Sequence, residues 1–208
     1  MSDRVEQIAA AVESVIPERP EGSDEKFATL LDELERWNQK VNLTAIRDPD
    51  EMITGHLLDS LVVRPLLKGC RILDVGTGAG FPGLPLAICE PERQFELVDG
   101  NNKKIRFVQH AVTTLQLDNV KATWARTEDF APDERFDTVI ARAVGPLARL
   151  VKMAGHLVGE NGVFIAMKGR YPDEELKELP QSWTYDIVEL EVPGLEQGSR
   201  HAVLLKRR

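Results

Sequence analysis

Cysteine is scarce in this chain of 208 residues, and long apolar segments are missing. The two cysteines, Cys70 and Cys89, lack the spacing of a metal motif and have no ligand partners nearby, so we expect reduced thiols and no metal site. No apolar run approaches the ~20 residues that a membrane-spanning helix needs. The first residues lack a basic stretch followed by an apolar core. We therefore expect a cytoplasmic protein without a signal peptide and without a membrane partner.

Positive charge is in the minority, because 26 lysines and arginines stand against 34 acids, for a formal net charge of −8. This balance argues at first against a nucleic-acid partner. The acids are clustered, however: residues 1–35 carry a net charge of −7 and residues 173–191 carry −6, which leaves the rest at +5. A polyanion could therefore bind one face, with modest and salt-sensitive affinity.

Apolar periodicity divides the chain into a helical part and an α/β part. In the first part, apolar residues recur at three- and four-residue spacing and predict three helices. One covers residues 5–16, one is capped by Ser23, and one begins at Asp48, with Pro49 in its first turn and Glu51 completing a capping box. From residue 71 the pattern predicts strands at 71–75, 94–99, 119–124, 136–141 and 161–168, with helices near 82–89, 101–116 and 146–158.

Such alternation of strands and helices indicates a parallel sheet with both faces covered. After it, two β-rich runs at 183–192 and 199–206, joined by residues 193–198, predict a hairpin. We expect two parts: a helical extension of residues 1–68, packed on a core domain of residues 69–208.

The most informative segment is residues 72–83, in which an apolar strand runs into a turn with glycine at every second position. Gly76, Gly78 and Gly80 would let the backbone approach a ligand closely, where a Cβ would block it. Asp99 follows the next apolar run, at a position where a carboxylate can accept hydrogen bonds from a ribose. These features together predict a pocket for a nucleoside cofactor.

Two cofactor classes compete for this pocket. Residues 78–83 match Gly-x-Gly-x-x-Gly, which leaves a dinucleotide oxidoreductase open, although a single match is weak. The acid at the strand end, Asp74, suits the ammonium and sulfonium of S-adenosylmethionine and would be poor beside a diphosphate. The glycine motif, Asp99 and the terminal hairpin are similar to the class I (Rossmann-like) methyltransferase fold, an α/β fold with a mostly parallel seven-stranded sheet and one antiparallel C-terminal strand. In that fold, residues at the positions of Thr127 and Glu128 flank the adenine.

The segment that follows the fourth expected strand, residues 139–146, bears on the kind of methyl transfer. It has no Asp/Asn-Pro-Pro-Tyr motif for exocyclic amines, no cysteine for attack on a pyrimidine, and no carboxylate cluster for a metal-bound catechol. Its Arg142 could form a salt bridge to the acidic cofactor loop, or hold the methionine carboxylate or an RNA phosphate. A ring nitrogen such as guanine N7 would need no base. A cofactor-binding assembly or regulatory factor without catalysis stays open as the alternative.

A set of motifs extends over nearly the whole chain: Trp37-Asn38-Gln39-Lys40-Val41-Asn42-Leu43-Thr44, His56-Leu57-Leu58-Asp59-Ser60, residues 81–86, Asp99 with Lys103-Lys104 and Phe107, Arg142-Ala143, Lys168-Gly169 and Arg200-His201. With these motifs the chain resembles the RsmG family, also called glucose-inhibited division protein B, of 16S rRNA guanine-N7 methyltransferases. Gly100 and Ala141 depart from the family pattern, since each stands where serine is usual.

This resemblance implies S-adenosylmethionine-dependent methylation of one guanine N7 in the decoding-region loop of 16S rRNA. It also implies that the substrate is the small ribosomal subunit, and we expect a monomer. The cofactor-binding residues that we predict are Asp74, Gly76, Gly78, Gly80, Phe81, Asp99, Thr127, Glu128 and Arg142.

Several further residues are predicted to contact RNA. Lys168, at the end of the fifth expected strand, lies where ligands bind in such sheets, and we expect it to act with Arg142 in catalysis. Asn38 and Asn42, at i and i+4, are expected to share a helix face that lines the substrate cleft. His56 is either a substrate contact or an ordinary buried histidine. The remaining candidates are basic: Lys103 and Lys104, for which a solvated helix face is the alternative, and Arg200 and His201.

Overall fold

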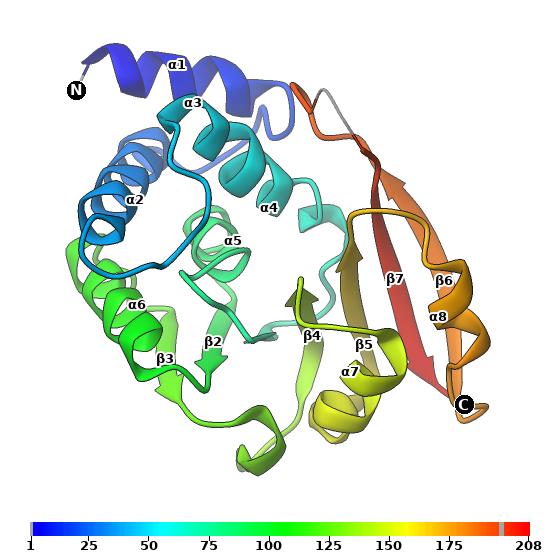
Figure 1. Ribbon diagram of the computed structural model, residues 1–208. Helices are drawn as coiled ribbons and strands as arrows, with labels where there is room; N and C mark the ends of the chain where they lie inside the picture. Colours follow the sequence, from blue (N-terminus) through cyan, green and yellow to red (C-terminus); the bar gives the residue numbers. More distant parts are fainter. Residues whose placement is uncertain (1, 196–197) are drawn as a thin grey trace.

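The computed structural model describes residues 2–195 and 198–208, and its core is a seven-stranded sheet in the order β3-β2-β1-β4-β5-β7-β6 (Figure 1). The first five strands pair in parallel, whereas β7 is antiparallel to both β5 and β6. This arrangement confirms the predicted fold class and the terminal hairpin, of which residues 196–197 lie outside the described part. The strands are β1 Arg71–Val75, β2 Gln94–Asp99, β3 Val120–Trp124, β4 Phe136–Arg142, β5 Val158–Lys168, β6 Trp183–Leu190 and β7 Arg200–Arg207.

Both faces of the central strands are buried, as the alternation of strands and helices predicted. Side chains alternate along each strand, so that Ile72 of β1 joins one apolar core and Leu73 joins the other. The first core includes α1 (Ser2–Glu13), α2 (Ser23–Asn38), α5 (Gly83–Cys89) and α6 (Asn102–Thr114). The second core includes α7 (Leu147–Ala154) and the 3-10 turn η4 (Gly155–Leu157), and α8 (Asp173–Lys177) packs against it. The helical extension therefore shares one core with the sheet, while its boundary at residue 68 stays a prediction.

The third predicted helix is more irregular than the sequence suggested. It begins as α3 (Pro49–Met52), and the Asp48 side chain accepts hydrogen bonds from the NH groups of Asp50 and Glu51, as expected of the cap. A π-helical segment, η1 (Ile53–Leu58), follows and leads into α4 (Asp59–Leu61) and the 3-10 turn η2 (Arg64–Leu66). Short π-helical segments are rare in proteins and are frequent at functional sites.

Two expectations about α2 are wrong. Its N-cap is Gly22, whose φ of 79° belongs to the left-handed region, and Ser23 is already the first helical residue. The helix ends at Asn38, so Asn42 lies in the loop that follows and shares no helix face with it. The chain turns after α2, and the buried side chain of Asn38 stabilises this turn. Its Oδ1 accepts hydrogen bonds from the NH groups of Leu43 and Thr44.

Within the part of the chain that the structure describes, no helix is long and apolar enough to cross a membrane. Both cysteines are free thiols, Cys70 at the surface and Cys89 in the core.

Candidate functional site

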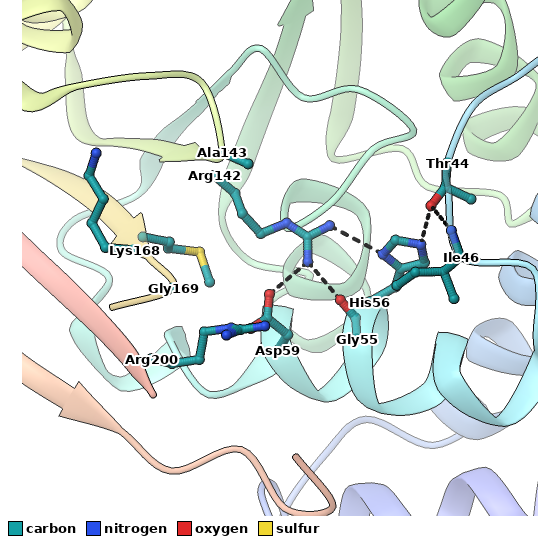
Figure 2. Close-up of a pocket in the computed structure, with 11 residues that line it drawn as sticks. Thr44, Ile46, Gly55, His56, Asp59, Arg142, Ala143, Lys168, Gly169 and Arg200 are labelled. Atoms are coloured by element: carbon teal, nitrogen blue, oxygen red, sulfur yellow. Dashed lines mark hydrogen bonds and ion pairs between the residues drawn. The ribbon is translucent and has the colours of Figure 1, made fainter. Parts of the chain in front are cut away.

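A cavity of about 460 Å³ opens at the carboxyl ends of β4 and β5, against the π-helical segment η1 (Figure 2). The carboxyl ends of parallel strands are where ligands bind in open α/β sheets. Residues from five separate parts of the chain line it: Thr44 and Ile46, the helical residues Gly55, His56 and Asp59, Arg142 and Ala143 at the end of β4, Lys168 of β5, and Arg200 of β7.

The glycine loop lies between β1 and α5, and its three alternate glycines have different reasons to be glycine. All three have positive φ, at 65°, 62° and 86° for Gly76, Gly78 and Gly80. A Cβ on Gly80 would lie 2.3 Å from Leu84 Cδ1, and one on Gly76 would lie 2.8 Å from Val144 Cγ2, so packing explains both. A Cβ on Gly78 would meet nothing closer than 3.8 Å. Neighbouring groups therefore do not exclude a Cβ at Gly78, where its absence would let a ligand approach the backbone closely.

Asp74 lies beneath this loop and is fully buried. Its Oδ2 accepts hydrogen bonds from Thr77 Oγ1 at 2.6 Å and from the Gly83 NH at 2.9 Å, which ties the two ends of the loop together. Its Oδ1 is buried without a partner among the described residues. Burial raises the pKa of Asp74 to about 6. The role of Asp74 toward a cationic ligand stays a prediction, because this carboxylate is fully buried and holds the two ends of the loop together.

Asp99 ends β2 beside the loop and is half-buried. One oxygen accepts from the Gly78 NH at 2.9 Å and the other from the Asn101 NH at 2.7 Å. Each carboxylate oxygen keeps a second lone pair for a hydroxyl donor. The 3-10 turn η3 (Thr127–Asp129) follows β3, the strand paired with β2; there Thr127 is buried and Glu128 is exposed.

Arg142 turns from the end of β4 toward the N-terminal helices. Its Nη1 donates to Asp59 Oδ2 at 2.8 Å and to the Gly55 carbonyl at 3.2 Å, and its guanidinium lies 5.7 Å from the centre of the Phe81 ring. The predicted salt bridge thus exists, but its partner is Asp59 of α4 and not an acid of the glycine loop. Figure 2 shows this arrangement.

His56 has the contacts of a buried, hydrogen-bonded histidine and still lines the cavity. Its Nε2 lies 2.8 Å from Thr44 Oγ1, its Nδ1 lies 3.5 Å from Arg142 Nη2, and its ring stacks on Phe81 with centroids 4.9 Å apart. Burial, and secondly the charge of Arg142, lower the pKa of His56 to about 4, so the ring is neutral at neutral pH. His56 can therefore be both an ordinary buried histidine and a substrate contact.

The cations on the other wall are also held by carboxylates. Arg200 Nε donates to Asp59 Oδ1 at 2.6 Å. Lys168 Nζ donates to Glu175 Oε2 at 2.6 Å and to the Gly145 carbonyl at 2.7 Å. Asp59 was not among the predicted site residues, although its position three residues after the candidate His56 was a usable signal, since such residues are neighbours on a helix.

Other predicted contact residues lie away from this cavity. The Asn38 side chain is hydrogen-bonded to the backbone of the turn after α2. Asn42 accepts a hydrogen bond from Arg47 at 3.3 Å. Lys103 is exposed on α6, whereas Lys104 is half-buried and carries its Nζ over the open side of Gly78. His201 is buried on β7, edge-on to Tyr171, and its Nδ1 has no partner among the described residues. Across those residues, no group of three or more His, Cys, Asp or Glu could hold a metal ion.

The fold is shared with solved methyltransferase structures of low sequence identity. A SAM-dependent methyltransferase from Aquifex aeolicus superposes with a TM-score of 0.58 at 15% identity, over 85% of this chain and 97% of that chain. A SAM-dependent methyltransferase from Thiobacillus denitrificans, in complex with S-adenosyl-L-homocysteine, gives 0.54 at 12% identity, over 73% and 90% of the two chains.

Closer similarity is found among sequence relatives. The "Ribosomal RNA small subunit methyltransferase G" of Idiomarina loihiensis is 42% identical over 204 residues, which are 98% of each chain. The protein of the same name from Cronobacter sakazakii is 45% identical over 188 residues, 90% of each chain. The family model GidB, described as rRNA small subunit methyltransferase G, matches residues 23–203. The chain therefore belongs to the GidB family, rRNA small subunit methyltransferase G.

Proposed function

We propose that this protein uses S-adenosylmethionine to methylate N7 of one guanine in the decoding-region loop of 16S rRNA, acting as a monomer on the small ribosomal subunit. The observation that carries the proposal is that Phe81 of the glycine loop, which Asp99 borders, contacts His56 and Arg142, and both of these line the cavity that has three cations in its wall. The names of the relatives point to small-subunit rRNA as the substrate class.

The residues around the loop fit the cofactor. Bare backbone at Gly78 leaves room for the nucleoside, and Asp99 has lone pairs free for ribose hydroxyls. The buried, unpaired Oδ1 of Asp74 suits the ammonium of a methionine moiety, since an unsatisfied buried acceptor is costly without a donor. Thr127 and Glu128 would border the adenine. When bound, S-adenosylmethionine would supply a methyl group on a sulfonium.

The cavity favours a substrate that is anionic and needs no proton removed. Arg142, Arg200 and Lys168 carry three positive charges against the two carboxylates of Asp59 and Glu175. This excess suits phosphate, and arginine in particular binds phosphate oxygens in pairs.

Each potential base in the cavity is already engaged. Asp59 and Glu175 are paired with cations, and His56 is neutral but has Arg142 against its Nδ1. Guanine N7 has a free lone pair, so alignment of the nucleophile is sufficient there. The chain's task is then to bind the RNA, hold the purine in line and exclude water.

The proposal is tested by methyl transfer from labelled S-adenosylmethionine to small ribosomal subunits that lack the modification. We expect transfer by the parent protein, loss of cofactor affinity in Asp99→Ala, and loss of turnover in Arg142→Ala. A parent protein that binds the cofactor and transfers nothing would instead indicate an assembly or regulatory factor. Tight NAD binding without affinity for S-adenosylmethionine would favour an oxidoreductase.

A further inference from the structure

Two ion pairs of the cavity meet at a single buried carboxylate, that of Asp59. Its Oδ2 accepts from Arg142 Nη1 at 2.8 Å and its Oδ1 accepts from Arg200 Nε at 2.6 Å. The Asp59 side chain is only 6% exposed, whereas those of the two arginines are 18% and 25% exposed. The Asp59 side chain is thus more deeply buried than the two arginine side chains that it joins, and all three line the cavity.

The position of Asp59 depends on the π-helical segment that precedes it. Asp59 is the first residue of α4, directly after η1, and its NH closes the segment by donating to carbonyls of the preceding turn, including that of Thr54. From the same segment, the Gly55 carbonyl accepts a second hydrogen bond from Arg142 at 3.2 Å. The N-terminal helices therefore fix, through one short segment, side chains that come from β4 and from β7.

Charge alone does not explain this arrangement. One carboxylate between two guanidiniums leaves a net charge of +1, so Asp59 reduces the attraction of the cavity for a polyanion. A buried ion pair is also weak support for stability, because desolvation opposes the Coulomb attraction. What the carboxylate does supply is a fixed spacing and orientation of two planar donors, which phosphate recognition requires.

We propose that Asp59 is a positioning residue of the methyl-transfer site: it orients Arg142 and Arg200 so that they hold the RNA backbone beside the target base in a single register. This inference rests on the proposed function and adds to it the residue that sets substrate geometry. Asp59 acts through the arginines and has no contact of its own with the reacting atoms.

The chain offers a closely matched control for this idea. Glu90, which follows α5, also joins two arginines: it accepts a hydrogen bond from Arg64 Nε at 2.5 Å and forms an ion pair with Arg93 Nε at 2.9 Å, and its side chain is 16% exposed. It is not among the residues that line the cavity. Asp59→Asn and Glu90→Gln each remove one bridging negative charge, so a general effect on stability should be common to both.

The experiment measures kcat, KM for small subunits and cofactor affinity for both variants and for Asp59→Glu, which keeps the charge. For Asp59→Asn we expect kcat to fall at least tenfold, cofactor affinity to stay within twofold, and KM to stay level or fall because the cavity becomes more positive. The kcat of Asp59→Glu should be at least threefold higher than that of Asp59→Asn. If Asp59→Asn does not fold, Asp59→Glu takes its place as the test variant. Glu90→Gln should match the parent protein.

An equal loss of kcat in Asp59→Asn and Glu90→Gln would overturn the inference, as would a loss confined to cofactor affinity. If the parent protein transfers no methyl group, the proposed function fails, and the inference is then decided by binding. The preference for small subunits over an unrelated RNA of similar length is the ratio of the two dissociation constants. This ratio should fall at least fivefold in Asp59→Asn and stay unchanged in Glu90→Gln. An unchanged preference in Asp59→Asn would contradict the role of Asp59.

Discussion

Replacing Gly78 by alanine separates the cost of backbone strain from the cost of blocking a ligand. The backbone φ of Gly78 is 62°, in the left-handed region that residues with a Cβ avoid. In the free protein the new methyl group would lie 3.8 Å from Lys104 Nζ and 3.9 Å from the Gly76 carbonyl, which are ordinary van der Waals distances. Steric overlap therefore adds nothing to the strain until the nucleoside cofactor enters.

The two costs differ in size and in the assay that detects them. Left-handed strain should lower the free energy of unfolding by about 1–2 kcal/mol. For a chain of this length, each kcal/mol lowers Tm by about 2–4 °C. A methyl group in the space proposed for the cofactor should lower S-adenosylmethionine affinity at least tenfold, which is about 1.4 kcal/mol. Thermal denaturation measures the first effect, and isothermal titration calorimetry measures the second.

Gly22 provides the matched control, because it has the same kind of backbone and no neighbours. Its φ is 79°, and nothing lies within 4 Å of the position that a Cβ would take. Gly22→Ala should lose similar stability and keep the parent's cofactor affinity. If Gly78→Ala binds S-adenosylmethionine as tightly as the parent protein does, the cofactor does not approach this loop and the reasoning is refuted.

Three more predictions concern other residues of the site. Burial, and then a neighbouring guanidinium, lower the pKa of His56 to about 4, whereas unfolded chains protonate histidine near pH 6.5. Its contribution to stability is therefore complete above pH 6.5 and is lost as pH falls toward 4; His56→Gln should flatten the pH dependence of unfolding, and equal slopes would contradict this. Asn38→Ala should cost about 1–3 kcal/mol in urea unfolding, because it leaves backbone NH groups of the following turn unpaired, whereas Asn42→Ala should change stability by less than about 0.5 kcal/mol. Lys168→Met keeps the apolar stem and removes the ammonium, so KM for small subunits should rise at least fivefold with cofactor affinity unchanged, and a change in cofactor affinity alone would contradict its placement.

The sheet was predictable wherever a strand is a continuous apolar run. The strands expected at 71–75 and 94–99 match β1 and β2 residue for residue, and four of the five residues of β1 and three of the six residues of β2 are buried. The start of β5 was missed. Residues 158–161 include Glu160 and Asn161 and look like a turn, yet Val158 pairs with Phe136 across an irregularity in register. Whether such residues form a strand depends on their pairing with residues that are distant in the sequence.

Local patterns failed at the entrance of the site for a different reason. The apolar pattern of the π-helical segment does not differ from that of a regular α-helix, so the sequence could not reveal it. The role of Asn38 depends on a turn whose geometry the amide itself creates. Asp59 was visible as an acid near His56, but its two arginine partners are 83 and 141 residues away in the chain. Motif spacing could identify the glycine loop, which is local, and could not identify a cavity assembled from five distant segments.

The most direct test of the central claim uses small ribosomal subunits that lack the modification, labelled S-adenosylmethionine and the purified protein, followed by mass mapping of the rRNA. We predict one N7-methylguanine, in the decoding-region loop of 16S rRNA. Label at another atom or another site, or no label on a protein that binds the cofactor, would contradict the claim.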